Sequence, residues 1–376
     1  MTETPNLRHR LARLRGPAVP PQPMDARALA ALAANPGCKR RALLDGAGVD
    51  KARLAQALGA PAVFGQSQFA FMRGNAFEAR VKSDGGSALL RLLCGEREFA
   101  GIDPASVAAP DLSAAGPEGR AARTALALRE ATEAGGWTLL DHPMLALRVA
   151  GSPVFLEPDA VVVRPDGRWV VVEIKSFPMI DGSADAAKVG AAARQSAVYV
   201  LALEAVAARL TGASVEHAVL LVCPKDFSNL PDGSLIDVRK QLAVTRRQLE
   251  RLTRIEDIAD LLPEGATFDV ERPAQELAAA VESVRAAYAP ECLSTCELAL
   301  HCRQRARSEG AVEALGRSVR GELGGLRSVD DVLAAARGER GDPADPTVAA
   351  LRRAAALRAE ALGARPEPAG TGAACP

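Results

Sequence analysis

The sequence predicts an α/β fold with a mixed central sheet flanked by helices. Two valine-rich runs, Val161–Val163 and Trp169–Val172, stand on either side of the turn sequence Arg164–Gly167, which indicates an antiparallel hairpin. Before and after this hairpin, short apolar runs alternate with longer segments of helical period. The chain has 376 residues and is 48% apolar, so it can form one large domain plus an appendage.

The first part of the chain is expected to be helical. Residues 1–24 are basic and contain several prolines, which indicates a flexible arm before the fold. Short helices should follow from Asp25 to Leu58. Longer helices are expected from about Arg73 to Ser83 and from about Gly119 to Ala134, where Gly135-Gly136 ends the second one.

The strands of the sheet are expected in the middle of the chain. A helix over Lys188–Leu203 should connect the hairpin to the last strand, and Lys225–Gly233 should be a loop with Pro231-Asp232-Gly233 at its tip. Further helices are expected over 238–252 and 274–289. The predicted strands are 137–140, 145–149, 154–156, 161–163, 169–172 and 216–223.

The chain changes character after Cys302, where short amphipathic segments alternate with glycine-containing turns. We therefore expect the main domain to cover residues 25–305, a helical C-terminal region to cover 306–365, and a disordered tail to cover 366–376. Within the helical region, Leu323–Leu333 is similar to a helix-hairpin-helix element, whose glycine turn exposes backbone N–H groups to a DNA phosphate. A plain helical cap is the alternative, because Gly-Gly turns between helices are common.

The hairpin carries charged groups that suit a metal site. Glu173 and Lys175 are two residues apart on one strand, so their side chains point the same way, while Ile174 points into the apolar layer. Asp159 precedes the partner strand and can lie across from them. Two close carboxylates repel each other unless a divalent cation lies between them, and Mg²⁺ prefers such oxygen ligands. The alternative is an ordinary surface hairpin with solvated charges.

Three residues elsewhere in the chain can reach the same site. Gln195 and Tyr199 lie four residues apart on an expected helix, so they share one face. They can contact a DNA backbone or support the lysine. Glu78 follows Gly74 near the start of another expected helix, and it can add a third acidic ligand.

These motifs together resemble a known nuclease family. Gly74–Glu78, Pro158-Asp159, Glu173-Ile174-Lys175 and Gln195–Tyr199 occur in the order and rough spacing of the RecB-like branch of the PD-(D/E)xK nucleases, and the resemblance covers about residues 35–303. It implies a restriction-endonuclease-like core and a deoxyribonuclease that depends on Mg²⁺ or Mn²⁺. Many relatives carry histidine where this chain has Glu78, which leaves the metal preference open.

The resemblance also implies a role for each motif residue. Lys175 would orient the attacking water or stabilise charge on the phosphoryl group. The implied catalytic residues are Asp159, Glu173, Lys175, Gln195 and Tyr199. The implied metal ligands are Glu78, Asp159, Glu173 and the backbone carbonyl of Ile174.

Four of the seven cysteines extend the resemblance. Cys38 precedes the nuclease motifs, and Cys292, Cys296 and Cys302 follow them, as in the iron–sulfur nucleases of the AddB type and the CRISPR-associated RecB-like exonucleases. This implies a 4Fe-4S cluster, held by these four cysteines, that joins the two ends of the nuclease domain. The three residues between Cys292 and Cys296 depart from the usual two. Zn²⁺ is the alternative, because four thiolates suit a tetrahedral zinc ion equally well.

The resemblance implies an exonuclease acting on single-stranded DNA or DNA ends, in repair, recombination or defence against mobile elements and viruses. The formal net charge is zero, which is unusual for an enzyme of nucleic acids, but a local basic cluster such as Lys39–Arg41 would suffice. A helicase or another repair or defence protein is an expected partner, because the chain has no nucleotide-binding P-loop. A non-catalytic DNA-binding or scaffold subunit, and a zinc-stapled endonuclease, are the alternatives.

The number of cysteines and the lengths of the apolar segments indicate the cellular compartment of the protein. The cysteine count is odd, and no apolar signal segment opens the sequence, so reduced thiols are expected rather than disulfides. No stretch approaches the length of a membrane span. We therefore expect a cytoplasmic protein.

Overall fold

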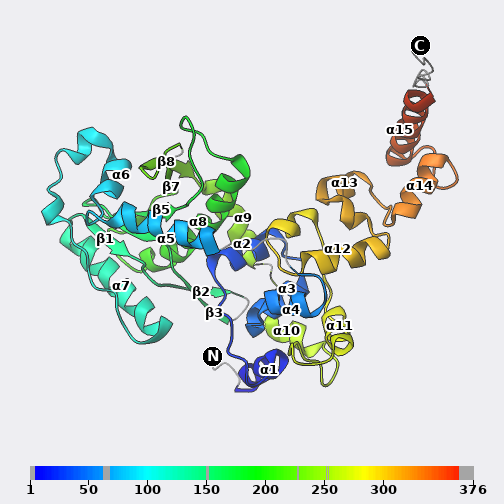
Figure 1. The fold of residues 1–376 in the computed structure, drawn as a ribbon, viewed down its shortest axis with the longest axis horizontal. Coiled ribbons are helices and arrows are strands. Elements are labelled where there is room, and N and C mark those ends of the chain that lie inside the picture. Colours follow the sequence, from blue (N-terminus) through cyan, green and yellow to red (C-terminus); the bar gives the residue numbers. More distant parts are fainter. Residues whose placement is uncertain are drawn as a thin grey trace, which may run out of the picture. The chain divides into compact units, whose positions relative to one another are not determined.

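The computed structural model describes residues 5–61, 68–149, 152–226, 228–250, 252 and 254–363. The chain divides into two units, whose elements are labelled in Figure 1. Unit 1 contains Met1–Ala287 and the short segment Thr295–Leu298, and unit 2 contains Tyr288–Ser294 and Ala299–Pro376. The domain boundaries expected near residues 24, 305 and 365 stay predictions.

A mixed sheet forms the centre of unit 1 (Figure 1). Its strands are β1 (Thr138–Asp141), β4 (Ala160–Val163), β5 (Arg168–Ile174), β6 (Ser214–Val215), β7 (Ala218–Pro224) and β8 (Pro231–Asp237). They lie in the order β1-β4-β5-β7-β8, and the short β6 also pairs with β5. β5 is parallel to β6 and β7, whereas the other neighbours are antiparallel. The expected α/β fold with a mixed central sheet is confirmed.

Helices cover both faces of this sheet. On one face, α5 (Gln68–Lys82) and α6 (Ser87–Phe99) bury Phe77, Val81 and Leu90 against Val162 and Val172 of the hairpin. On the other face, α8 (Ala186–Ala207) packs against β5, β6 and β7. Because both faces are covered, β4 and β5 are apolar along nearly their whole length instead of alternating between apolar and polar residues.

The remaining helices of unit 1 include those expected from the sequence near residues 25–58, 119–134 and 238–252. These remaining helices are α1 (Pro5–Arg15), α2 (Ala26–Ala34), α3 (Lys39–Ala47), α4 (Lys51–Ala57), α7 (Gly116–Ala134), α9 (Arg239–Glu250), α10 (Ile255–Asp260) and α11 (Ala274–Glu282).

None of the helices in the described part of the chain combines the length and the apolar character needed to cross a membrane.

The N-terminal segment differs from the expected flexible arm. Residues 5–15 form α1, whose Leu11 and Leu14 are buried. The Leu14 carbonyl accepts a hydrogen bond of 2.6 Å from Phe268 N, and Arg15 Nη1 donates one of 2.7 Å to the Ala47 carbonyl. The prolines that indicated an arm all lie at Pro17 or later, apart from Pro5 at the start of the helix, where proline is tolerated.

Two expectations for the strands were wrong. The segments near 145–149 and 154–156 do not join the central sheet, because β2 (Leu145–Val149) and β3 (Ser152–Leu156) pair only with each other as a separate hairpin. Pro231-Asp232-Gly233 is not a loop tip but the start of β8, an edge strand antiparallel to β7. Proline is tolerated at the first residue of an edge strand, so its turn signal was misleading here.

The described elements of unit 2 are all helical. Ala335 of α14 and Val348 of α15 are buried where these two helices pack together. The helix expected over 274–289 is shorter, since α11 ends at Glu282, and the expected tail over 366–376 lies outside the described residues. The elements of unit 2 are η2 (Pro290–Ser294), α12 (Ala299–Ser308), η3 (Val312–Leu315), α13 (Arg317–Glu322), α14 (Val329–Arg337) and α15 (Pro346–Gly363).

The turn that joins β4 to β5 should be highly sensitive to a single added methyl group. Gly167 has a φ of +79°, and a Cβ there would overlap the backbone oxygen of Gly212. Gly265 has a similar φ of +78° with open space around it, so it is a matched control. We expect Gly265→Ala to cost about 1 kcal/mol of unfolding free energy from φ strain alone, and Gly167→Ala to cost clearly more, because a backbone atom must also move. Equal losses in urea unfolding would contradict this account.

Candidate active site

The register of the β4–β5 hairpin brings the first pair of site residues together. Ala160 lies opposite Val172, so Asp159 and Glu173 meet at the end of the hairpin. Ile174 N donates a hydrogen bond of 2.6 Å to Asp159 Oδ2, which fixes this carboxylate against the neighbouring strand. Because side chains alternate along a strand, Ile174 lies on the face covered by α5 and α6, and Glu173 lies on the face covered by α8.

Glu173 is a fully buried carboxylate. Its exposed fraction is 0%, its Oε1 atom forms an ion pair with Lys175 Nζ, and its Oε2 atom has no hydrogen-bond partner among the described residues. Burial raises the pKa of Glu173 to about 7, and the neighbouring Asp159 adds to this shift while Lys175 opposes it. A buried carboxylate oxygen without a partner is costly, so this position calls for a cation.

The two neighbours of Glu173 respond to the same surroundings. Burial raises the pKa of Asp159, although the Lys175 charge and the Ile174 N–H oppose the shift. Burial alone would lower the pKa of Lys175, but the carboxylates of Glu173 and Asp159 outweigh it, and the pKa is raised. Lys175 therefore stays a charged ammonium between two carboxylates.

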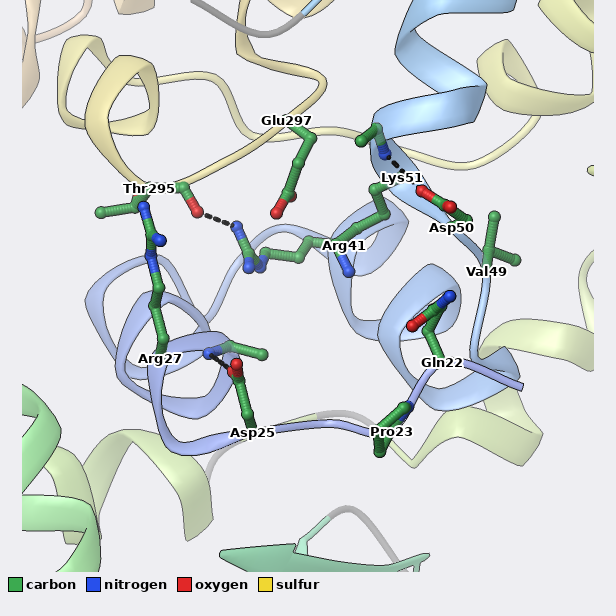
Figure 2. Close-up of a pocket in the computed structure, with 12 residues that line it drawn as sticks. Gln22, Pro23, Asp25, Arg27, Arg41, Val49, Asp50, Lys51, Thr295 and Glu297 are labelled. Atoms are coloured by element: carbon green, nitrogen blue, oxygen red, sulfur yellow. Dashed lines mark hydrogen bonds between the residues drawn. The ribbon is translucent and has the colours of Figure 1, made fainter. Parts of the chain in front are cut away.

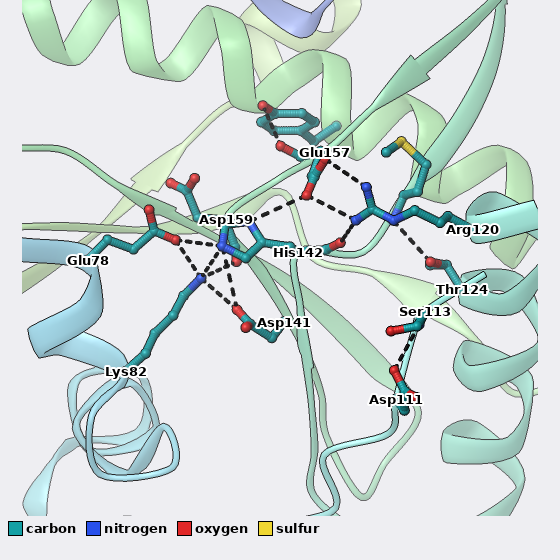
Figure 3. Close-up of polar contacts among 12 residues, drawn as sticks. Glu78, Lys82, Asp111, Ser113, Arg120, Thr124, Asp141, His142, Glu157 and Asp159 are labelled. Carbon is teal, nitrogen blue, oxygen red and sulfur yellow. Dashed lines mark hydrogen bonds and ion pairs between the residues drawn. The ribbon is translucent and has the colours of Figure 1, made fainter. Parts of the chain in front are cut away.

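Glu78 enters the site from α5 and belongs to a second group of polar side chains (Figure 3). Its Oε1 atom lies 2.9 Å from His142 Nε2 and 2.6 Å from Lys82 Nζ. The hydrogen bond from His142 is the largest cause that holds the pKa of Glu78 at about 2; burial opposes this shift, and Lys82 adds to it. The same hydrogen bond raises the pKa of His142. Glu78 thus stays ionised at any physiological pH.

A backbone network holds the second group against the hairpin. His142 has a positive φ of 44°, which is uncommon outside glycine, and its N–H donates to the Asp159 carbonyl at 3.3 Å. Arg120 donates to the His142 carbonyl at 3.0 Å and pairs with both carboxylate oxygens of Glu157 (Figure 3). Strained backbone of this kind is often found at functional sites.

Gln195 and Tyr199 share one face of α8, as expected, but the hydrogen bond that links them to the hairpin goes to the Glu157 carbonyl and not to Lys175. Gln195 Nε2 donates to Tyr199 Oη at 3.0 Å, and Tyr199 Oη donates to the Glu157 carbonyl at 3.2 Å. Burial, with a contribution from Glu173, raises the pKa of Tyr199 well above its usual value, so the hydroxyl stays neutral and can donate. Tyr199 thereby fixes the backbone that leads into Asp159.

The structure brings Asp159, Glu173 and Lys175 into one centre, with Glu78 close enough to raise the pKa of both carboxylates in it. Sequence reasoning missed four residues around this centre. The signal for Asp141, His142 and Glu157 was a polar side chain next to the end of a predicted strand, where buried backbone must be satisfied, whereas Arg120 lies within a predicted helix and gave no such signal. The missed residues are Arg120, Asp141, His142 and Glu157.

The next feature is the set of oxygen atoms that the sequence predicted to bind a divalent metal ion. Within the described ranges, no three side chains of His, Cys, Asp or Glu are arranged to hold a metal ion. The oxygen donors at the hairpin end nevertheless fit a hard divalent cation, because the buried Glu173 Oε2 has no partner among those residues. The ligand set of Glu78, Asp159, Glu173 and Ile174 stays a prediction.

The four cysteines of the predicted cluster are divided between the two units. Cys38 precedes α3 and is buried in unit 1, and Cys296 lies in the Thr295–Leu298 segment of the same unit. Cys292 lies in η2 and Cys302 in α12, both in unit 2. The four-cysteine cluster also stays a prediction.

A pocket in unit 1 is lined by charged side chains, and one of them, Arg41, contacts the segment that carries Cys296 (Figure 2). The Arg41 side chain is almost fully buried; its Nη1 donates to the Thr295 carbonyl at 2.6 Å, and its Nε donates to Asp45 Oδ2 at 3.0 Å. Lys51 Nζ lies 2.6 Å from the other oxygen of Asp45. These buried charges connect α3 to a segment more than 250 positions later in the chain.

Comparison with known proteins found little. No family model and no curated protein matches the chain. Among solved structures, a protein from Eubacterium rectale named "Putative exonuclease" has 15% sequence identity and a TM-score of 0.31, covering 68% of this chain and 87% of that chain. A protein named SSO0001 has 11% identity and a TM-score of 0.18, covering 53% and 84%. At TM-scores this low, neither likeness establishes a common fold.

The burial of Glu173 predicts an unusual pH dependence for the metal-free protein. A folded-state pKa of about 7, against an ordinary value of 4.5, means that the folded state binds more protons than the unfolded state between these pH values. Stability should therefore fall as the pH rises through this window, by about 3 kcal/mol relative to Glu173→Gln. Urea unfolding in EDTA from pH 4.5 to 8 would measure this difference.

The exposed Glu264, in the loop between α10 and α11, provides the control. Glu264→Gln should keep the pH dependence of the wild-type protein. If the Glu173→Gln curve instead ran parallel to the wild-type curve, Glu173 would be ionised in the folded protein through its pairing with Lys175.

Proposed function

We propose that this chain is a metal-dependent deoxyribonuclease of the PD-(D/E)xK type, which hydrolyses phosphodiester bonds in DNA. The arrangement of Asp159, Glu173 and Lys175 at the end of the β4–β5 hairpin carries this proposal. Two carboxylates and an ammonium in so buried a position are costly for fold stability alone, and such shifted groups are typical of catalytic centres.

The donor atoms at this centre suit one divalent cation, Mg²⁺ or Mn²⁺. Asp159, Glu173 and the carbonyl of Ile174 would hold it, with Glu78 nearby as a further acidic ligand. When bound, such an ion supplies Lewis-acid stabilisation of the phosphoryl oxygens and a more acidic water. The support for this assignment is the Oε2 atom of Glu173, which has no hydrogen-bond partner in the part of the chain that the structure describes, and the raised pKa of both hairpin carboxylates.

The protein side chains have separable tasks in this proposal. Lys175 keeps its charge beside the two carboxylates, so it can orient the attacking water or stabilise negative charge on the phosphoryl group. Tyr199 and Gln195 position the Glu157 backbone, and through it Asp159. Ile174 N–H holds the Asp159 carboxylate in place.

The finer description follows the resemblance of the motifs. We propose an exonuclease on single-stranded DNA or DNA ends, acting in repair, recombination or defence against mobile elements. Its partners would be DNA and a helicase or other proteins of the same process, because the sequence has no nucleotide-binding P-loop. The proposed compartment is the cytoplasm.

We also propose that Cys38, Cys292, Cys296 and Cys302 hold a 4Fe-4S cluster. The support is their sequence pattern together with the contact of Arg41 with Thr295, which ties the segment of Cys296 to the helix that follows Cys38. Such a cluster would close a loop of about 250 residues, and closing a long loop restricts the unfolded chain.

Cleavage of end-labelled single-stranded and duplex DNA in the presence of Mg²⁺ or Mn²⁺ tests the proposed activity. Lys175→Ala should reduce the rate by about 10²–10³-fold, because it removes a charged group at the reacting phosphate. Lys240→Ala, at an exposed position of α9, is the control for loss of a positive charge. Equal cleavage by wild-type protein and a folded Lys175→Ala variant would exclude this centre as the source of activity.

Iron analysis of anaerobically purified protein tests the cluster. Cys38→Ala should lose the iron and lower the free energy of unfolding, on the order of 4 kcal/mol as for opening a long closed loop. Cys94→Ala on α6, outside the predicted cluster, should keep the iron of the wild-type protein. Zinc in place of iron would support the tetrahedral zinc alternative, and unchanged metal content in Cys38→Ala would overturn the assignment.

A further inference from the structure

The ammonium of Lys82 lies at a position with the surroundings of a bound cation (Figure 3). Lys82 Nζ is 2.6 Å from Glu78 Oε1, 2.6 Å from Asp141 Oδ1 and 2.9 Å from the backbone oxygen of Asp159. His142 Nε2 lies 3.2 Å away. The three oxygens are donor types that also bind divalent metal ions, whereas His142 Nε2 donates its proton to Glu78 Oε1.

These contacts come from separate parts of the fold. Glu78 is one helical turn before Lys82 on α5, Asp141 ends β1, and His142 follows it. The Lys82 side chain is only 15% exposed, although Asp141 is 60% exposed. The ammonium is therefore largely shielded from solvent and lies next to Asp159.

The charges of the centre favour one divalent ion. When ionised, Glu78, Asp141, Asp159 and Glu173 contribute four negative charges, and Lys82 and Lys175 contribute two positive charges. Glu157 is paired with Arg120, and its Oε1 atom also lies 3.7 Å from His142 Nδ1. With His142 neutral, two negative charges are left, and a single divalent cation balances them, whereas a second one would create an equal positive excess.

We infer that Lys82 takes the place of a second metal ion, so that the centre works with a single divalent cation on the side of Asp159 and Glu173. This inference rests on the proposed nuclease function and adds the metal stoichiometry of its site. Lys82 is a positioning residue in this description: its charge holds Glu78 and the Asp159 backbone where a second cation would otherwise be required.

The number of Mn²⁺ ions bound per chain tests this inference without any measurement of activity. Metal-stripped full-length protein is titrated with Mn²⁺ and followed by calorimetry and by the EPR signal of free Mn²⁺. Wild-type protein should bind one ion at the centre. Lys82→Met, which keeps the side-chain length but removes the charge, should bind two. Lys82→Arg and the exposed-site control Lys240→Met should each bind one.

Glu173→Gln separates the ion at the centre from Mn²⁺ bound elsewhere, since it should remove one ion from the wild-type count. Two centre ions in the wild-type protein would overturn the inference, whatever the variants do. A Lys82→Met variant that is folded by circular dichroism and still binds one ion would also overturn it. No Mn²⁺ bound by the wild-type protein at all would instead reject the proposed metal-dependent function, and the inference with it.

Discussion

The pairing of β4 with β5 is the constraint on which the rest of the centre depends. Its register places Asp159 beside Glu173, and the hydrogen bond from Ile174 N–H to Asp159 fixes that placement at 2.6 Å. A shift of one residue would turn Glu173 toward the apolar layer of α5 and α6 and expose Ile174 to the charged side. The valines on both strands, which are buried on both faces, oppose such a shift because every register but the observed one would change their packing.

Much of the fold could be predicted, because local patterns control the elements that build it. The valine runs and the turn Arg164–Gly167 predicted the hairpin, and helical periodicity predicted α5, α7, α8 and α9. Strand alternation placed Glu173 and Lys175 on one face, and the pairing of the two hairpin strands placed Asp159 across from them; in the structure these side chains lie at the same end of the hairpin. Strand geometry has a period of two residues, so it fixes which side chains share a face without any knowledge of distant contacts.

The features that could not be predicted depend on contacts between distant segments. The β8 strand begins with Pro231-Asp232-Gly233, whose local preference is a turn, and only its pairing with β7 makes it a strand. Arg120 joins the site by donating to the His142 carbonyl, and a backbone carbonyl leaves no signal in the sequence. The same holds for α1, whose Leu14 carbonyl accepts a hydrogen bond from Phe268 N–H, more than 250 positions away.

The burial of Glu173 also has a consequence during synthesis of the chain. Glu173 loses its water only when β7 pairs beside β5 and α8 covers that face, and β7 ends at Pro224. A growing chain in which β7 has not yet left the ribosome therefore exposes the Glu173 carboxylate to solvent. The β4–β5 hairpin alone does not hold the charged side chains in the arrangement of the folded protein. A ribosome-bound fragment would carry the motif residues without the low-dielectric surroundings that shift their protonation. The buried surroundings of Glu173 therefore require a chain that is long enough to include β7.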